Sequence, residues 1–153
     1  MADGKGRQEL IAAVGRATQA YQRATDGFDD AVGRRLDLNP TDLRCLDWLT
    51  EGPMSAGELS RATGLSSAAT TTLVDRLEGR GLVRRGRDQD DRRRVVVELT
   101  DDARQHLEAL YGPLAREGGR LLARFDDEDL RLLIEFLDEA TRVVEEHEAR
   151  LRS

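Results

Sequence analysis

The chain has 153 residues, of which 35% are charged and 39% hydrophobic, and its formal net charge is −6. This length favours a single domain with a real hydrophobic core. No apolar run approaches the roughly 20 residues that a membrane span needs. The first residues also lack the apolar stretch of a signal peptide. We therefore expect a cytoplasmic protein that does not enter a membrane.

The first 50 residues predict two helices. Apolar residues recur at three- and four-residue steps over about residues 6–36, which indicates one long helix. Asn39 is a good N-cap for a second helix, and Pro40 suits its first position because the missing N–H costs nothing there. Gly52-Pro53 is expected to end this helix.

The next segment predicts two short helices joined by a glycine turn. Ser55 and Glu58 match the capping box S-x-x-E at the start of the first one. Gly64 supplies the turn, and Ser66 or Ser67 caps the second helix, which runs to about residue 80. Its buried edge is expected to consist of Ala69, Leu73, Val74 and Leu77. This order is that of a helix-turn-helix.

The opposite face of the second short helix carries small polar side chains. Short side chains let a helix approach a DNA groove, and hydroxyls and guanidinium groups bond to base edges or phosphates. Asp75 has two interpretations, because it can accept from a cytosine amine or pair with an arginine. The candidate DNA contacts on this helix and its cap are Ser66, Ser67, Ala68, Thr70, Thr71, Thr72, Asp75 and Arg76.

A β-hairpin with a basic tip is predicted over about residues 82–99. Gly81 ends the preceding helix, and the β-branched run 95–99 indicates the second strand. Between Arg80 and Arg94, seven arginines outnumber three aspartates, so this stretch is basic although the whole chain is acidic. Local potential governs docking on phosphates. The candidate DNA contacts here are Arg87, Asp91, Arg92, Arg93 and Arg94.

Two further helices, expected over about residues 101–152, complete a mainly α fold of six helices with a two- to three-stranded β-wing. Thr100 and Asp126 are their expected N-caps. The apolar stripes of the terminal helices exceed what one 153-residue chain can cover. We therefore expect a homodimer in which residues 6–36 and 101–152 interlock around DNA-binding lobes formed by residues 40–99, with the helix-turn-helix at about 55–78. Its target would be a pseudo-palindromic double-stranded DNA.

The run LSSAATTTLVDRLEGRGLVRR, followed by DQDDRRRVVVELT, resembles the MarR family of bacterial transcription regulators. The resemblance implies a dimeric winged-helix protein, usually a repressor, whose recognition helix corresponds to about residues 66–80. It also implies that Asp91 orients Arg93 into the minor groove, with Arg92 and Arg94 as phosphate contacts beside it. Many relatives carry a basic residue where this chain has Thr72, which suggests an altered operator.

Many members of the family release DNA when a small phenolic or other lipophilic anion binds between the dimer helices and the winged lobe. By this resemblance, an effector site would be formed by aromatic and histidine side chains. The alternative for the aromatic residues is ordinary packing in the core or the dimer interface. The alternative for His106 is an exposed position on a helix. The candidates are Tyr21, Phe28, Trp48, His106 and Tyr111.

Catalytic chemistry is not indicated. The chain lacks a Ser/His/Asp arrangement, a phosphate-binding glycine loop and a set of residues at metal-ligand spacing, so we expect neither an enzyme nor a metal or other cofactor. The single cysteine, Cys45, excludes an intrachain disulfide. Two alternatives remain at this stage: a regulator of the same fold that senses oxidation through Cys45, and a helical module that binds a protein partner.

Overall fold

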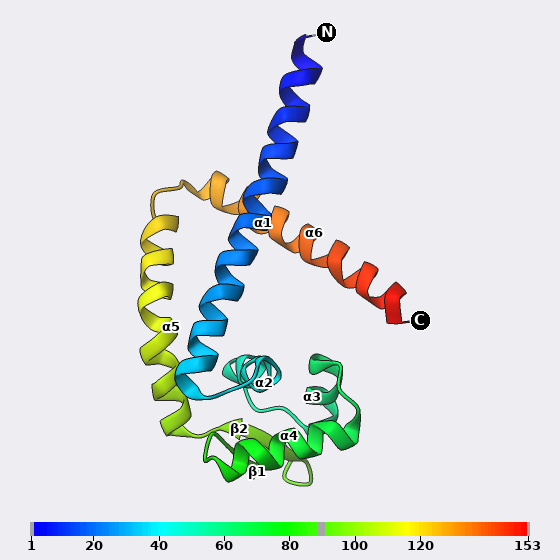
Figure 1. Ribbon diagram of the computed structural model, residues 1–153, viewed down its shortest axis with the longest axis vertical. Coiled ribbons are helices and arrows are strands. Elements are labelled where there is room, and N and C mark those ends of the chain that lie inside the picture. The colour runs from blue at the N-terminus through cyan, green and yellow to red at the C-terminus, as the bar shows by residue number, and fades with distance from the viewer. Residues whose placement is uncertain (1, 89–90, 153) are drawn as a thin grey trace. The chain divides into compact units, whose positions relative to one another are not determined.

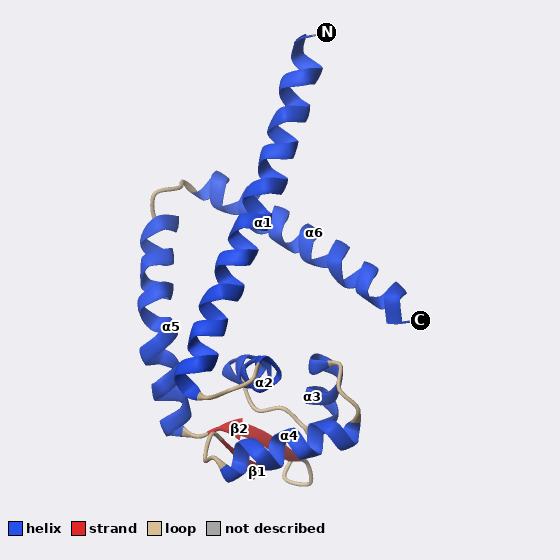
Figure 2. Ribbon diagram, in the orientation of Figure 1, coloured by secondary structure: helices blue, strands red, loops and turns tan. Residues whose placement is uncertain are grey.

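The computed structural model describes residues 2–88 and 91–152, with side chains described for residues 5–88 and 91–151. Within these ranges the chain forms six helices and one two-stranded sheet (Figures 1 and 2). The elements are α1 (Ala2–Leu36), α2 (Pro40–Thr50), α3 (Ala56–Thr63), α4 (Ser67–Gly79), β1 (Val83–Arg87), β2 (Val95–Leu99), α5 (Asp101–Leu122) and α6 (Asp127–Arg152). The predicted mainly α fold with a β-wing is confirmed. The chain divides into two compact units, Met1–His106 and Leu107–Ser153, and the boundary falls inside α5.

The predicted starts of the five helices after α1 are confirmed, because the expected side chains cap them. In the capping box of α3, Ser55 Oγ accepts a hydrogen bond from the N–H of Glu58 at 3.3 Å, and Glu58 accepts from the N–H of Ser55 at 2.7 Å. Such a cap stabilises a helix by about 1 kcal/mol. The residues whose side chains accept from first-turn amides are Asn39, Ser55, Ser66, Thr100 and Asp126.

Two glycines make the tight connections on either side of α4. Gly64 ends α3 with φ 71°, and Gly81 leads from α4 into β1 with φ 70°. Both lie in the left-handed region, which glycine adopts without the steric cost of a Cβ. These two turns direct α3, α4 and the hairpin into one lobe.

The core of the first unit lies between α2, α3, α4 and the sheet. Its largest fully buried side chains include Leu46, Leu49, Leu59, Leu73, Leu77 and Leu99. The packed pairs of elements include α2 with α3, α3 with α4, α4 with β1, and both α2 and α3 with β2. The predicted buried edge of α4 was wrong at one position, since Ala69 is exposed and Thr70 is buried in its place. Positions 69 and 70 are adjacent on a helix with 3.6 residues per turn. The small side chains around them do not indicate which of the two faces the core.

The hairpin strands are antiparallel, with Val83 opposite Leu99 and Arg87 opposite Val95. Met54, in the connection between α2 and α3, adds an isolated bridge to Val97 through hydrogen bonds of 3.0 and 2.8 Å. The buried valines and leucine of β2 therefore anchor the hairpin to the lobe, and its polar loop lies at the far end of the strands.

The long helices keep much of their apolar surface exposed. In the first unit, the N-terminal half of α1 extends away from the winged lobe (Figure 1), and Leu10 and Tyr21 are 70% and 72% exposed. In the second unit, α6 exposes Leu132, Ile134, Phe136, Leu137, Val143, Val144 and Leu151. None of the described helices combines the length and the apolar character needed to cross a membrane.

Candidate nucleic-acid interface

The exposed face of α4 begins with side chains that carry no charge. Ser67, Ala68, Thr71 and Thr72 are all exposed, as the sequence predicted for the groove-facing side. Thr70 does not belong to this face, so its inclusion among the candidate DNA contacts was wrong: its side chain is fully buried and its hydroxyl donates to the Ser66 carbonyl at 3.0 Å. The first two turns of α4 are thus small and smooth enough to enter a groove.

Both exposed threonines use their hydroxyl protons inside the helix. Thr71 Oγ1 donates to the carbonyl of Ser67 at 3.0 Å, and Thr72 Oγ1 donates to the carbonyl of Ala68 at 3.1 Å. This bond to the residue four positions earlier is common for threonine in helices. It leaves the methyl group and the acceptor lone pairs of the hydroxyl oxygen as the parts of each side chain that are not committed to the helix.

The charged residues farther along α4 pair within the protein. Arg76 forms an ion pair with Asp42 of α2, whose side chain is only 2% exposed, and this contact raises the pKa of the Arg76 guanidinium. Asp75 pairs with Arg85 of β1 at 2.5 Å, and Arg85 also contacts Glu78. Of the two interpretations of Asp75, the structure contains the arginine pair.

Arg80, at the end of α4, binds the end of α1. Its guanidinium donates to the carbonyls of Leu36 and Asp37 at 2.8 and 2.5 Å. Asp37 has a left-handed backbone with φ 53°, and it follows the last residue of α1. Cations favour the C-terminal end of a helix, where carbonyls lack partners. Arg80 therefore positions α4 on α1 in addition to adding charge to the lobe.

At the base of the hairpin loop, Arg94 is tied to α3. Its guanidinium pairs with Glu58 and lies 3.6 Å from a carboxylate oxygen of Asp88. The backbone and hydroxyl hydrogen bonds from Ser55, followed by the bond from Arg94, lower the pKa of Glu58 to about 2. One carboxylate thus caps α3 and holds the hairpin.

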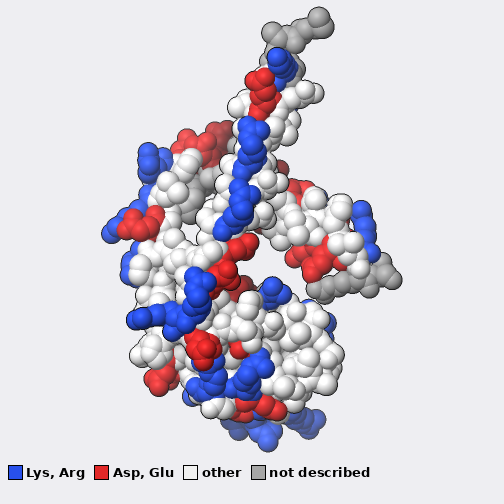
Figure 3. Space-filling model, viewed as in Figure 1, with Lys and Arg blue, Asp and Glu red and all other residues white. Residues whose placement is uncertain are grey.

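The described part of the hairpin tip presents Arg92 and Arg93 to solvent. Asp91 accepts the backbone N–H of Arg93 at 3.0 Å, and Arg87 donates to the carbonyl of Arg92 at 2.9 Å, so backbone bonds shape the tip. Among the side chains described, those of residues 5–88 and 91–151, no carboxylate forms an ion pair with either guanidinium. Figure 3 shows basic side chains over α4 and the hairpin at the lower end of the first unit.

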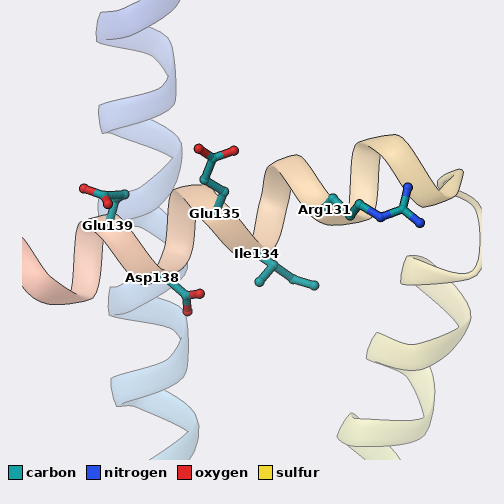
Figure 4. Close-up of a pocket in the computed structure, with 5 residues that line it drawn as sticks. All are labelled: Arg131, Ile134, Glu135, Asp138 and Glu139. Atoms are coloured by element: carbon teal, nitrogen blue, oxygen red, sulfur yellow. The ribbon is translucent and has the colours of Figure 1, made fainter.

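The five candidate effector residues have different surroundings. Tyr21, Trp48 and His106 are exposed, whereas Phe28 and Tyr111 are half-buried. A hollow of about 330 Å³ along α6 contains none of them (Figure 4). It is lined by Arg131, Ile134, Glu135, Asp138 and Glu139. Three carboxylates in this lining disfavour an anionic ligand.

Cys45 is fully buried in α2. Burial, together with the nearby charge of Asp42, raises the pKa of its thiol to about 11. The thiolate is the reactive form of cysteine, so this side chain is poorly placed for oxidation or metal binding at neutral pH.

Sequence reasoning missed the two acidic residues that hold α4 and the hairpin in position. Asp42 was not singled out, and Glu58 was recognised as a cap but not as the partner of Arg94. The ion pairs Asp42–Arg76 and Glu58–Arg94 join residues 34 and 36 positions apart, so no local sequence pattern indicates them. The available signal was chemical: a buried aspartate on an otherwise apolar helix side needs a cation.

The lobe therefore has the architecture of a winged helix-turn-helix, the class that places one helix in a major groove. Residues 36–94 match the model of the MarR family. The HTH-type transcriptional regulator YcgE of Bacillus subtilis is 38% identical over 153 residues, which cover 99% of each chain. The HTH-type transcriptional repressor NicR of Pseudomonas putida is 42% identical over 105 residues, covering 65% of this chain and 62% of NicR.

Among solved structures, a MarR family protein from Bacillus stearothermophilus is similar, with a TM-score of 0.64 and 25% sequence identity. The match covers 90% of this chain and 96% of that one. The chain belongs to the MarR family, and it is a DNA-binding transcriptional regulator rather than an enzyme.

Proposed function

We propose that this protein is a homodimeric repressor that binds a pseudo-palindromic operator and releases it when a small effector binds. The observation that carries the proposal is the pairing, on one lobe, of an uncharged groove-sized face on α4 with two solvent-exposed arginines at the hairpin tip. The name of the relative NicR supports repression as the direction of control.

The division of contacts follows from the surroundings of each side chain. Ser67, Ala68, Thr71 and Thr72 face the base edges of the major groove, with Ser66 at the helix start near a phosphate. Arg92 binds phosphate, and Arg93 enters the adjacent minor groove. Arg87 supports the tip through its bond to the Arg92 carbonyl. Arg76 and Arg94 act mainly by positioning, because carboxylates of the protein already hold them.

The dimer follows from the apolar surface of each unit taken by itself. The N-terminal half of α1 and the length of α6 both carry exposed leucine, isoleucine, valine or aromatic side chains. Apolar stripes of this length on soluble helices mark an interface. A symmetric pair of chains presents two α4 helices, which is why the operator is expected to have half-sites about 10 base pairs apart.

Effector release requires a ligand that prefers a dimer in which the two α4 helices no longer match that spacing. Tyr21, Phe28, Trp48, His106 and Tyr111 stay the candidates for contacting a small aromatic or lipophilic molecule. The redox alternative is disfavoured because Cys45 is buried and its thiol has a pKa of about 11.

The direct test is selection of bound duplexes from random DNA, followed by titration of the selected operator with the purified protein. We expect an inverted repeat, two chains per duplex by analytical ultracentrifugation, and an affinity that falls steeply as salt rises. A protein that stays monomeric, or that enriches no duplex at low ionic strength, would contradict the proposal. Either outcome would instead favour a helical module that binds a protein partner.

A further inference from the structure

The groove-facing turns of α4 offer methyl groups and few hydrogen-bond donors. Ala68, Thr71 and Thr72 lie three and four residues apart, so they share one exposed face. The threonine hydroxyl protons are used by the carbonyls of Ser67 and Ala68. In the described part of this face, Ser67 is the residue whose hydroxyl makes no bond within the protein.

The arginines that would ordinarily read guanine are held elsewhere. Guanine presents two acceptors in the major groove and is read by a two-pronged donor such as arginine. Arg76, the arginine of α4, is paired with the buried carboxylate of Asp42. Arg80, which follows the helix, donates to two carbonyls at the end of α1. These contacts fix where each guanidinium lies, so a two-pronged approach to guanine would compete with them.

We propose that the protein reads its operator half-site through the 5-methyl groups of thymines, which contact the methyl groups of Ala68, Thr71 and Thr72. Thymine is the base that carries an apolar group on its major-groove edge, and alanine and threonine methyls are its natural partners. This inference rests on the proposed function and adds to it the base class that α4 recognises. The hairpin arginines supply phosphate and minor-groove contacts, and α4 discriminates among bases in the major groove.

The experiment uses the full-length protein and the operator obtained by selection from random DNA. The half-sites should contain thymines at the positions that α4 covers. Each of these thymines is then replaced by deoxyuridine, which removes the 5-methyl group and leaves base pairing intact. We expect affinity to fall about fourfold for each methyl contact that is lost. When one such thymine is replaced at the equivalent position of both half-sites, the combined loss of affinity is on the order of tenfold. Deoxyuridine placed outside the half-sites serves as the control and should have no effect.

Two matched variants separate the methyl group from the hydroxyl. Thr72→Val keeps the methyl and replaces the hydroxyl with a second methyl, so it should still prefer the thymine operator over the deoxyuridine operator. Thr72→Ser keeps the hydroxyl and removes the methyl, so its preference should shrink by about fourfold. Circular dichroism and the oligomeric state check that each variant is folded, and the same pair at Thr71 repeats the test.

The outcomes distinguish this inference from the proposed function. If the selected operator is bound but deoxyuridine substitution changes its affinity by less than twofold, methyl recognition is overturned while DNA binding stands. The same holds if guanines are the invariant bases under α4. If selection enriches no duplex at all, the proposed function fails, and this inference fails with it.

Discussion

The arginines next to or within α4 and those of the hairpin tip have different partners. Arg76 contacts the buried Asp42, and Arg85, which faces α4 from β1, contacts Asp75 and Glu78. Arg92 and Arg93 at the tip are exposed, and within the described residues they have no carboxylate partner. The same residue type thus fixes the position of the recognition helix in one region and remains available for phosphate in the other.

This difference separates two properties that a DNA-binding protein needs. Affinity for any duplex comes from cations that can displace counterions, and we propose that the exposed arginines of the tip have this role. The shape of the proposed DNA-binding surface and the position of α4 on it depend on contacts that form within the protein before DNA binds. These contacts surround α4. Counting the arginines of the 80–94 stretch as equal phosphate contacts would miss this separation.

The largest effect should come from removing the exposed arginines of the tip. Arg92→Ala combined with Arg93→Ala should weaken operator binding on the order of a hundredfold, because each dimer loses four cations near phosphates, and it should flatten the salt dependence. Fluorescence anisotropy at several salt concentrations measures both. Arg84→Ala is the matched control: Arg84 lies on the same hairpin but pairs with Glu98 at 2.8 Å, so its loss should change affinity by less than about threefold. Equal losses for the two variants would remove the distinction between paired and exposed arginines.

A smaller effect should follow from Asp42→Asn, which removes the charge that holds Arg76. We expect the free energy of unfolding to fall by about 1–2 kcal/mol, less than for a fully buried pair because Arg76 is 45% exposed. Chemical denaturation measures this change.

Asp47→Asn on the same helix is the control for that variant. Partial burial, followed by the charges of Asp29 and Glu51, raises the pKa of Asp47, so its negative charge is disfavoured in the folded state. Neutralising it should leave stability unchanged or slightly higher. A loss at residue 47 as large as that at residue 42 would contradict the role assigned to the Asp42–Arg76 pair.

The smallest effect should be the pH dependence contributed by Glu58. Its pKa is lowered from 4.5 to about 2, so its charged form stabilises the fold above about pH 4.5, and this contribution disappears as the pH falls toward 2. Glu58→Gln should therefore be less stable than the wild type at neutral pH and should match it near pH 2. Thermal unfolding across this range measures the difference, and a gap that does not close in acid would exclude the carboxylate as its source.

The sequence was informative wherever a local rule determined the outcome. The caps at Asn39, Ser55 and Thr100 and the turns at Gly64 and Gly81 depend on a few neighbouring residues, and all were predicted correctly. Helix α1 begins at Ala2, a few residues earlier than expected, because fraying ends carry little signal.

The sequence was less informative where partners are distant along the chain. It did not indicate that Arg76 and Arg94 would be held by Asp42 and Glu58, because such pairs form only when the lobe folds. Thr70 was placed among the DNA contacts because hydroxyl residues fill three consecutive positions, and composition alone cannot say which of them turns inward.

The most direct test of the account is to map where α4 and the hairpin meet the operator. Cysteines introduced as Ala69→Cys on α4 and Val95→Cys beside the hairpin tip can be labelled with an iron chelate that cuts nearby DNA, since the native Cys45 is buried and its thiol has a pKa of about 11. We predict cuts from the major groove of each half-site for α4 and from the adjacent minor groove for the hairpin, while a Gln8→Cys label on α1 gives none. Cutting by the α1 label alone, or no symmetric cutting from either lobe position, would contradict the account.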